Sequence, residues 1–120
     1  MLAIGTDIVR VARLERHVTR PDSGFVRRSF TERERELCGD RVSSLAGRWA
    51  AKESVMKALG AGIGEVPLTD IEIDRDADGR PVLRLRGVAA LRAEQAGLSH
   101  WQVSISHDGE YAVAMVVASG

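Results

Sequence analysis

Two carboxylates far apart in the sequence, Asp7 and Glu53, stand in settings that suit a divalent-cation site. Asp7 interrupts an apolar segment, residues 2–9, in which an unpaired charge would be costly. The alternative is that Asp7 ends a strand and caps the following helix. Mg²⁺ is usually held by one or two carboxylates together with waters and substrate phosphates, so this pair would be sufficient.

The lysines of the chain are concentrated in one short segment. Of the 17 Lys and Arg residues only Lys52 and Lys57 are lysines, which suggests that this segment needs an ammonium group. One interpretation is that Arg48, Lys52 and Lys57 form a cationic ridge for phosphates, while Glu53 holds the cation. The other is that Glu53 and Lys57, four residues apart on a helix, form a surface ion pair. Spacing alone does not choose between the two.

A glycine-rich loop, Gly60-Ala61-Gly62-Ile63-Gly64, directly follows this lysine segment. Glycines allow the backbone to approach a ligand closely, and such loops bind phosphates. The simpler alternative is a helix C-cap followed by a turn. Because the loop follows a helix, it matches neither the P-loop nor the dinucleotide-binding motif, in which the glycines lie between a strand and a helix.

A histidine stands at the end of a predicted strand, in Ser104-Ile105-Ser106-His107-Asp108. Adjacent Ser, His and Asp residues do not form a hydrolase triad, and the sequence has no G-x-S-x-G motif. His107 is therefore expected to bind a ligand anion or a backbone group. The remaining histidines, His17 and His100, are expected on the surface.

Arginines dominate the first predicted helix. They either form a solvated face or dock an acidic protein by charge. The residues are Arg10, Arg13, Arg16 and Arg20.

The elements that must position these groups alternate between strand and helix patterns. Thr31 and Glu34 form a capping-box pattern at the start of a short charged helix. The predicted order is a strand, three helices, a hairpin, a helix and a hairpin, which indicates one α+β domain over residues 1–120 with a mainly antiparallel sheet and helices packed on one face. The expected elements are a buried strand (2–9), a helix ending near Pro21, the capped helix (32–37), a helix from Ser43 to Leu59, a hairpin (71–74 with 82–86), a helix (88–96) and two strands around His107-Asp108-Gly109.

The composition excludes several classes of protein. Lys+Arg and Asp+Glu number 17 each, and this balance argues against a nucleic-acid binder. No apolar run approaches the roughly 18–20 residues that span a bilayer, so no membrane association is expected. The N-terminus lacks the pattern of a signal peptide. The single cysteine, Cys38, excludes an internal disulfide and fits a reducing cytoplasm.

Taken together, these motifs resemble the phosphopantetheinyl transferases of the holo-acyl-carrier-protein synthase type. The family pattern is an apolar-G-x-D-apolar segment, matched by Ile4-Gly5-Thr6-Asp7-Ile8, followed by W/F-A-x-K-E-S/A-x-x-K, matched by residues 49–57. The segments 46–48, 60–64 and 103–107 also look like this family. The likeness covers the whole chain, although Thr6 stands where an apolar residue is more usual.

The resemblance implies transfer of 4'-phosphopantetheine from coenzyme A to a serine of an apo-acyl carrier protein, with release of adenosine 3',5'-bisphosphate. It implies that Asp7 and Glu53 bind Mg²⁺, for which oxygen ligands would also accept Mn²⁺. Lys57 would stabilise charge on the transferred phosphoryl group. The serine proton would pass to Glu53 or to an activated water. The implied contacts to coenzyme A come from Arg48, Lys57, Gly60, Gly62, Gly64 and His107.

The resemblance also implies two kinds of protein contact. The arginines of the first helix, Arg13 in particular, would dock the acidic recognition helix of the carrier protein. The family further suggests a homotrimer with active sites between protomers, and the apolar final strand 112–118 is compatible with cover on both faces.

Two other functions compete with the transferase. A coenzyme-binding module without catalysis would not need both Asp7 and Glu53. An oligomeric scaffold that binds an acidic partner or RNA through its arginines would leave Asp7, Glu53 and Lys57 unexplained. Aromatic residues make up only 4% of the chain, which offers few stacking platforms for RNA.

Overall fold

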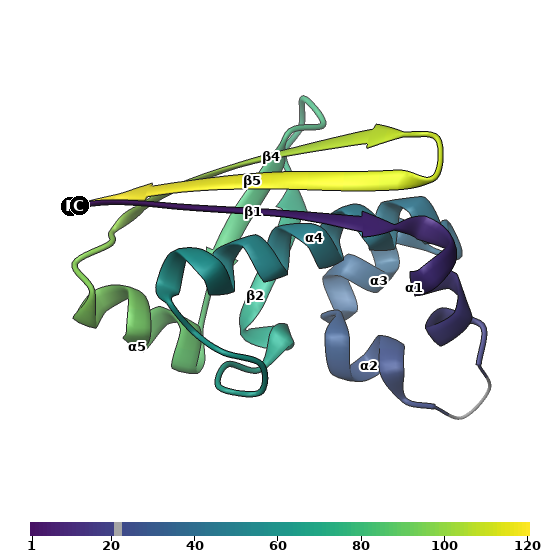
Figure 1. Cartoon of the computed structure of the whole chain (residues 1–120), viewed down its shortest axis with the longest axis horizontal. Helices are drawn as coiled ribbons and strands as arrows, with labels where there is room; N and C mark the ends of the chain where they lie inside the picture. The colour runs from purple at the N-terminus through teal and green to yellow at the C-terminus, as the bar shows by residue number, and fades with distance from the viewer. Residues whose placement is uncertain (21–22) are drawn as a thin grey trace.

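The computed structural model describes residues 1–20 and 23–120. The chain is α+β, with two antiparallel sheets and its helices on one side of the larger sheet (Figure 1). None of the described helices is long and apolar enough to cross a bilayer. The elements are β1 (Leu2–Arg10), α1 (Val11–Val18), α2 (Phe25–Ser29), α3 (Glu32–Cys38), α4 (Val42–Leu59), the 3-10 helix η1 (Leu68–Asp70), β2 (Ile71–Arg75), β3 (Pro81–Leu85), α5 (Gly87–Gln95), β4 (His100–Asp108) and β5 (Tyr111–Ser119).

The larger sheet has the strand order β1-β5-β4, so the strand that comes last in sequence is the central one. Leu2 pairs with Ser119 at one end of the β1–β5 ladder, and Arg10 pairs with Tyr111 at the other. The N- and C-termini consequently lie side by side at one end of the sheet (Figure 1).

Helix α4 packs across the inner face of this sheet because small residues allow a close approach. Ala112 and Ala114 of β5 point inward and are fully buried. Gly5 of β1 lies directly against the α4 backbone, since a Cβ on Gly5 would come within 2.8 Å of the carbonyl carbon of Ser54. The Ser54 hydroxyl donates to the carbonyl of Ala114 at 3.2 Å, which fixes the helix to the central strand. These contacts place the second half of α4 beside Asp7.

The outer face of the larger sheet is apolar and open in the single chain. Ile4 and Ile8 of β1 are 68% and 64% exposed, and Met115 of β5 is 55% exposed. The prediction that residues 2–9 form a strand is confirmed, but the expectation that this strand is buried is wrong. Its side chains alternate between the helix-covered face and the open face.

The other helices differ from the prediction in number and in one boundary. The described part of the chain has four α-helices before the first hairpin rather than three, because the five-residue helix α2 carries no periodic signal, and the short 3-10 helix η1 follows them. The capping box at Thr31 and Glu34 is confirmed. Helix α1 ends at Val18, and Pro21, near which its end was predicted, lies outside the described residues. Both hairpins and the helix before Gly97 are confirmed.

Candidate functional site

Asp7, Lys57 and Glu53 meet where β1 crosses the C-terminal half of α4. The Lys57 ammonium lies 3.2 Å from Oδ1 of Asp7 and donates to the carbonyl of Thr6 at 2.9 Å. The lysine is thus bound to the strand that carries Asp7 and not to Glu53, its neighbour one turn earlier. The ion pair between Glu53 and Lys57 considered from spacing is therefore not formed. Asp7 does not cap the next helix either, since the N-cap of α1 is Arg10 and has no side-chain cap.

The electrostatics of Glu53 favour a bound cation. Its partial burial, and then the negative charge of Asp7, raise the pKa of Glu53 above its ordinary value, while Lys57 opposes the shift. A divalent cation between two such carboxylates would relieve their repulsion and the desolvation of Glu53. No cluster of three or more His, Cys, Asp or Glu ligands occurs among residues 1–20 and 23–120. Two carboxylates leave the remaining positions to water and substrate phosphates, the usual arrangement for Mg²⁺.

Asp7 and Glu53 line a common cavity of about 420 Å³. Three ring side chains form one wall of this cavity. The His17 ring stacks on Phe25 with 5.2 Å between ring centroids, and the centroids of Phe25 and Trp49 are 5.4 Å apart. The sequence placed His17 on the surface without a role. It is exposed, but it also lines this cavity. Nothing in the sequence pattern marks His17 or Phe25, because their contact depends on α2 folding back against α1.

Arg48 and His107 line a second cavity, of about 180 Å³. His107 approaches α4 because Gly47 has no side chain, and a Cβ there would lie 2.9 Å from Nε2 of His107. Nε2 lies 2.9 Å from the carbonyl oxygen of Ser43, which can only accept, so Nε2 carries the proton and donates it. Arg48 is 6% exposed and donates from Nε to the carbonyl of Ile73 at 3.0 Å. The structure thus brings together two of the residues expected to contact coenzyme A.

Lys52 does not belong to a cationic ridge, and this prediction is wrong. Its side chain is fully buried, and its ammonium lies 2.7 Å from Oε1 of Glu34. The ammonium also donates to the carbonyls of Leu68 and Ile71. The sequence could not show this, because Lys52 and Lys57 look equivalent until α3 and β2 cover one of them.

The glycine-rich loop begins as a helix C-cap. Gly60 caps α4 in the left-handed conformation, with φ 69°, which favours glycine. The amide of Gly62 donates to Glu65 Oε1 at 2.6 Å, so the side chain of the residue that directly follows the loop closes it. Only Gly64, of the three glycines assigned to coenzyme A, lines a cavity with Glu53, of about 350 Å³.

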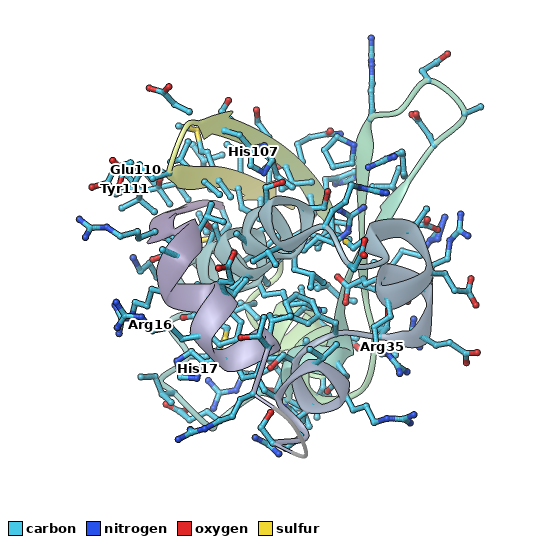
Figure 2. All side chains as sticks on the ribbon, turned by 90° about the vertical axis from the view of Figure 1, so that its right-hand side faces the viewer. Arg16, His17, Arg35, His107, Glu110 and Tyr111 are labelled. Atoms are coloured by element: carbon cyan, nitrogen blue, oxygen red, sulfur yellow. The ribbon has the colours of Figure 1, made fainter. Side chains whose placement is uncertain are left out.

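Three of the four arginines lie close together at the end of β1 and on α1. Arg10 is the last residue of β1 rather than a helical residue, and it donates to the hydroxyl of Tyr111 at 2.9 Å. Arg10, Arg13 and Arg16 line one shallow cavity, and Figure 2 shows Arg16 and Tyr111 at this edge of the molecule. Arg20 is exposed beyond the end of α1 and lines none of the cavities described here.

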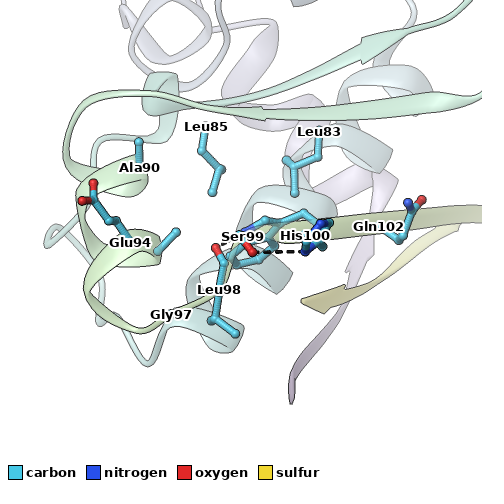
Figure 3. Close-up of a pocket in the computed structure, with 11 residues that line it drawn as sticks. Leu83, Leu85, Ala90, Glu94, Gly97, Leu98, Ser99, His100 and Gln102 are labelled. Carbon is cyan, nitrogen blue, oxygen red and sulfur yellow. Dashed lines mark hydrogen bonds between the residues drawn. The ribbon is translucent and has the colours of Figure 1, made fainter. Parts of the chain in front are cut away.

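A cavity larger than those described above lies elsewhere, between β3, α5 and the start of β4 (Figure 3). It measures about 680 Å³ and is lined by Leu83, Leu85, Leu98 and Trp101 among others. None of the predicted site residues is among the described residues that line it. Size alone therefore does not identify the functional site of this chain.

Comparison with known proteins agrees with this geometry. The model of the 4'-phosphopantetheinyl transferase superfamily matches residues 3–116. A holo-[acyl-carrier-protein] synthase of Herpetosiphon aurantiacus is 45% identical over the full length of both chains. The enzyme of the same name from Gloeobacter violaceus is 48% identical over 98% of this chain and 92% of its own.

Solved structures show the same fold. The holo-[acyl-carrier-protein] synthase of Helicobacter pylori, in complex with coenzyme A, superposes with a TM-score of 0.87 at 38% identity, covering 97% of this chain and 99% of that one. The Chronobacterium ammoniagenes ACPS-CoA complex has the same TM-score at 31% identity, covering 99% and 97%. By fold, motif and full-length similarity, the chain belongs to the 4'-phosphopantetheinyl transferase superfamily.

Proposed function

We propose that the cluster of Asp7, Glu53 and Lys57 is the catalytic centre of a holo-[acyl-carrier-protein] synthase activity. The chain transfers 4'-phosphopantetheine from coenzyme A to a serine of apo-acyl carrier protein, which yields the holo-carrier protein and adenosine 3',5'-bisphosphate. The observation that carries the proposal is the shared cavity of Asp7 and Glu53, with the Lys57 ammonium 3.2 Å from Asp7.

Asp7 and Glu53 would hold Mg²⁺, or Mn²⁺, against the pyrophosphate of coenzyme A. A cation held there would supply neutralisation of charge on the phosphate oxygens, which together with positioning is what phosphoryl transfer depends on. Lys57 stabilises the charge that develops on the β-phosphoryl group. Glu53, or a water that it activates, accepts the proton of the attacking serine.

Arg48 and His107 would bind the phosphates of the 3'-phosphoadenosine. Arg48 and Glu53 are five residues apart on α4, which turns their side chains about 140° away from each other around the helix axis. The two cavities have no lining residue in common. This separation supports a site completed between protomers, with the phosphoadenosine half from one copy and the metal half from another. Gly60, Gly62 and Gly64 would add backbone contacts.

The open apolar face of the larger sheet supports a homotrimer. Ile4, Ile8 and Met115 lie on this face, and burial against other copies would remove them from water. Arg10, Arg13, Arg16 and Arg20 remain available to the acidic helix of the carrier protein, since none of them forms an ion pair with a described residue.

We place this single domain, residues 1–120, in the cytoplasm. Cys38 is free and buried, as is common for proteins of a reducing compartment.

The test is the intact mass of an apo-acyl carrier protein after incubation with this protein, coenzyme A and Mg²⁺. The expected result is a mass gain of one phosphopantetheine. No gain is expected in the presence of EDTA or with the Glu53→Gln variant. Coenzyme A binding without any mass gain, across several carrier proteins, would favour the binding module instead. A gain that EDTA does not reduce would refute the metal assignment.

A further inference from the structure

A fully buried ion pair lies close to the cavity lined by Arg48 and His107, which is called the phosphate cavity below. The pair takes no part in the chemistry described above. Lys52 and Glu34 are both 0% exposed, and their charged atoms are 2.7 Å apart. Burial lowers the pKa of Lys52, and the Glu34 carboxylate counteracts this shift. Replacing a buried pair by apolar residues of similar volume is often neutral or stabilising, so stability alone gives little reason for this one.

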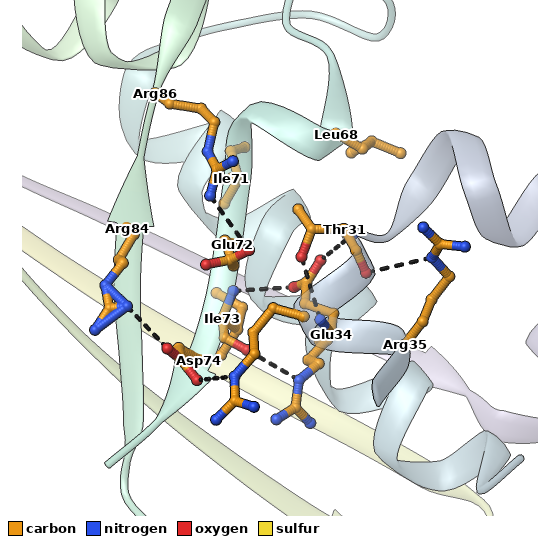
Figure 4. A network of polar contacts seen from close by, with 12 residues as sticks. Thr31, Glu34, Arg35, Leu68, Ile71, Glu72, Ile73, Asp74, Arg84 and Arg86 are labelled. Atoms are coloured by element: carbon orange, nitrogen blue, oxygen red, sulfur yellow. Dashed lines mark hydrogen bonds and ion pairs between the residues drawn. The ribbon is translucent and has the colours of Figure 1, made fainter. Parts of the chain in front are cut away.

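The Glu34 carboxylate accepts from the N-cap of its own helix and from donors on α4 and β2 (Figure 4). Oε1 accepts from the amide of Thr31 at 2.9 Å and receives the Lys52 ammonium of α4. Oε2 accepts from the amide of Ile73 on β2 at 2.9 Å. Because both oxygens are used, the carboxylate fixes β2 relative to α3 and α4.

Ile73 connects Glu34 to Arg48, which lines the phosphate cavity. The amide of Ile73 is held by Glu34, and its carbonyl accepts from Nε of Arg48 at 3.0 Å. Within the described residues, Nε is the only nitrogen of Arg48 that donates to the protein, so the two terminal nitrogens are left for a ligand. The position of β2 therefore sets the orientation of the guanidinium.

We propose that Glu34, held by the buried ammonium of Lys52, is a positioning residue for Arg48: through Ile73 it aims the guanidinium at a phosphate of coenzyme A. Neither residue touches the substrate. The inference rests on the proposed role of Arg48 and adds to it the device that orients this side chain.

Glu34→Gln tests the device with little change in volume. The donors to Glu34 are bound by two carboxylate oxygens, whereas glutamine offers one acceptor oxygen. One of the two backbone amides, or the Lys52 ammonium, therefore loses its acceptor. The expected result is a KM for coenzyme A raised about tenfold, as for weakening one charge-assisted hydrogen bond, with kcat nearly unchanged. Cys38→Ala, on the same helix and equally buried, is the control for simple destabilisation and should leave this KM unchanged.

A double-mutant cycle with Arg48→Ala decides whether the effect passes through Arg48. Arg48→Ala alone should raise the KM for coenzyme A, and adding Glu34→Gln should raise it no further. An equal additional rise in the double mutant would overturn the proposal, as would an unchanged KM in folded Glu34→Gln. If Arg48→Ala alone has no effect, the role of Arg48 in the proposed function fails, and the positioning role fails with it.

The double variant Glu34→Gln/Lys52→Met covers the case in which Glu34→Gln does not fold. It removes both buried charges and still leaves Ile73 or Thr31 without an acceptor. The same rise in KM is expected from the folded protein, and an unchanged KM would overturn the proposal.

Discussion

Gly5→Ala should both destabilise the fold and separate the two proposed metal ligands, Asp7 and Glu53. A Cβ on Gly5 would lie 2.8 Å from the carbonyl carbon of Ser54, whereas ordinary contacts of a Cβ begin at 3.4 Å. The carbonyl carbon alone requires strand and helix to move apart by about 0.6 Å, and the Ser54 carbonyl oxygen, which would lie nearer still, requires more. Because the obstacle is helix backbone, no side-chain rotation relieves it. Overpacking of this kind costs about 3 kcal/mol, which corresponds to a loss of about 12 °C in Tm for a chain of this length.

The same displacement moves Asp7 on β1 away from Glu53 on α4. The expected result is a higher Mg²⁺ concentration for half-maximal transfer, in addition to the lower Tm. Thermal denaturation and a Mg²⁺ titration of carrier-protein modification measure the two effects. Gly97→Ala is the control: nothing lies near its Cβ, so only the left-handed backbone, with φ 73°, adds about 1 kcal/mol. Gly5→Ala with wild-type Tm and Mg²⁺ dependence would refute the close packing of β1 on α4.

The remaining predictions concern the charges of the site. Because the pKa of Glu53 is raised in the fold, the native state retains its proton above the unfolded pKa, and the stability from this group falls as pH rises through that window. Glu53→Gln should thus raise Tm at neutral pH in EDTA while abolishing transfer; a lower Tm would contradict the assignment. Lys57→Met should raise the pKa of Glu53 further, measured by NMR titration without metal, and should lower kcat about 100-fold; an unchanged pKa would place Lys57 elsewhere. Arg13→Glu should raise KM for the carrier protein far more than KM for coenzyme A; equal effects on both would argue against docking.

The sequence was most informative where function demands a residue type at a fixed spacing. Asp7 and Glu53 were paired from chemistry and resemblance alone, and the structure places them in one cavity. Strong local signals also located the capping box at Thr31 and both hairpins. Such features depend on residues that are close together in the sequence, so a single sequence is enough to predict them.

Most of the failures involve contacts between distant segments. Lys52 and Lys57 have the same type and share a helix, yet one is buried against Glu34 and the other bonds to β1. Which side of α4 is covered depends on where α3 and β2 pack, and no local pattern contains that information. The aromatic wall that includes Phe25 is likewise not predictable from the sequence, because α2 is only five residues long and gives no periodic pattern.

The order β1-β5-β4 also constrains how the protein is made. On the ribosome β1 emerges first and β4 much later, and the strand that pairs with both is synthesised after them. Until β5 leaves the exit tunnel, neither strand has its neighbour in this sheet, and the side of α4 that faces Ala112 and Ala114 stays uncovered. Asp7 and Glu53 are therefore translated early, but the hydrogen bond from Ser54 to Ala114 that fixes α4 to the sheet forms only after β5 has been synthesised. A nascent chain stalled before β5 would expose unpaired strand edges, which are natural substrates for chaperones.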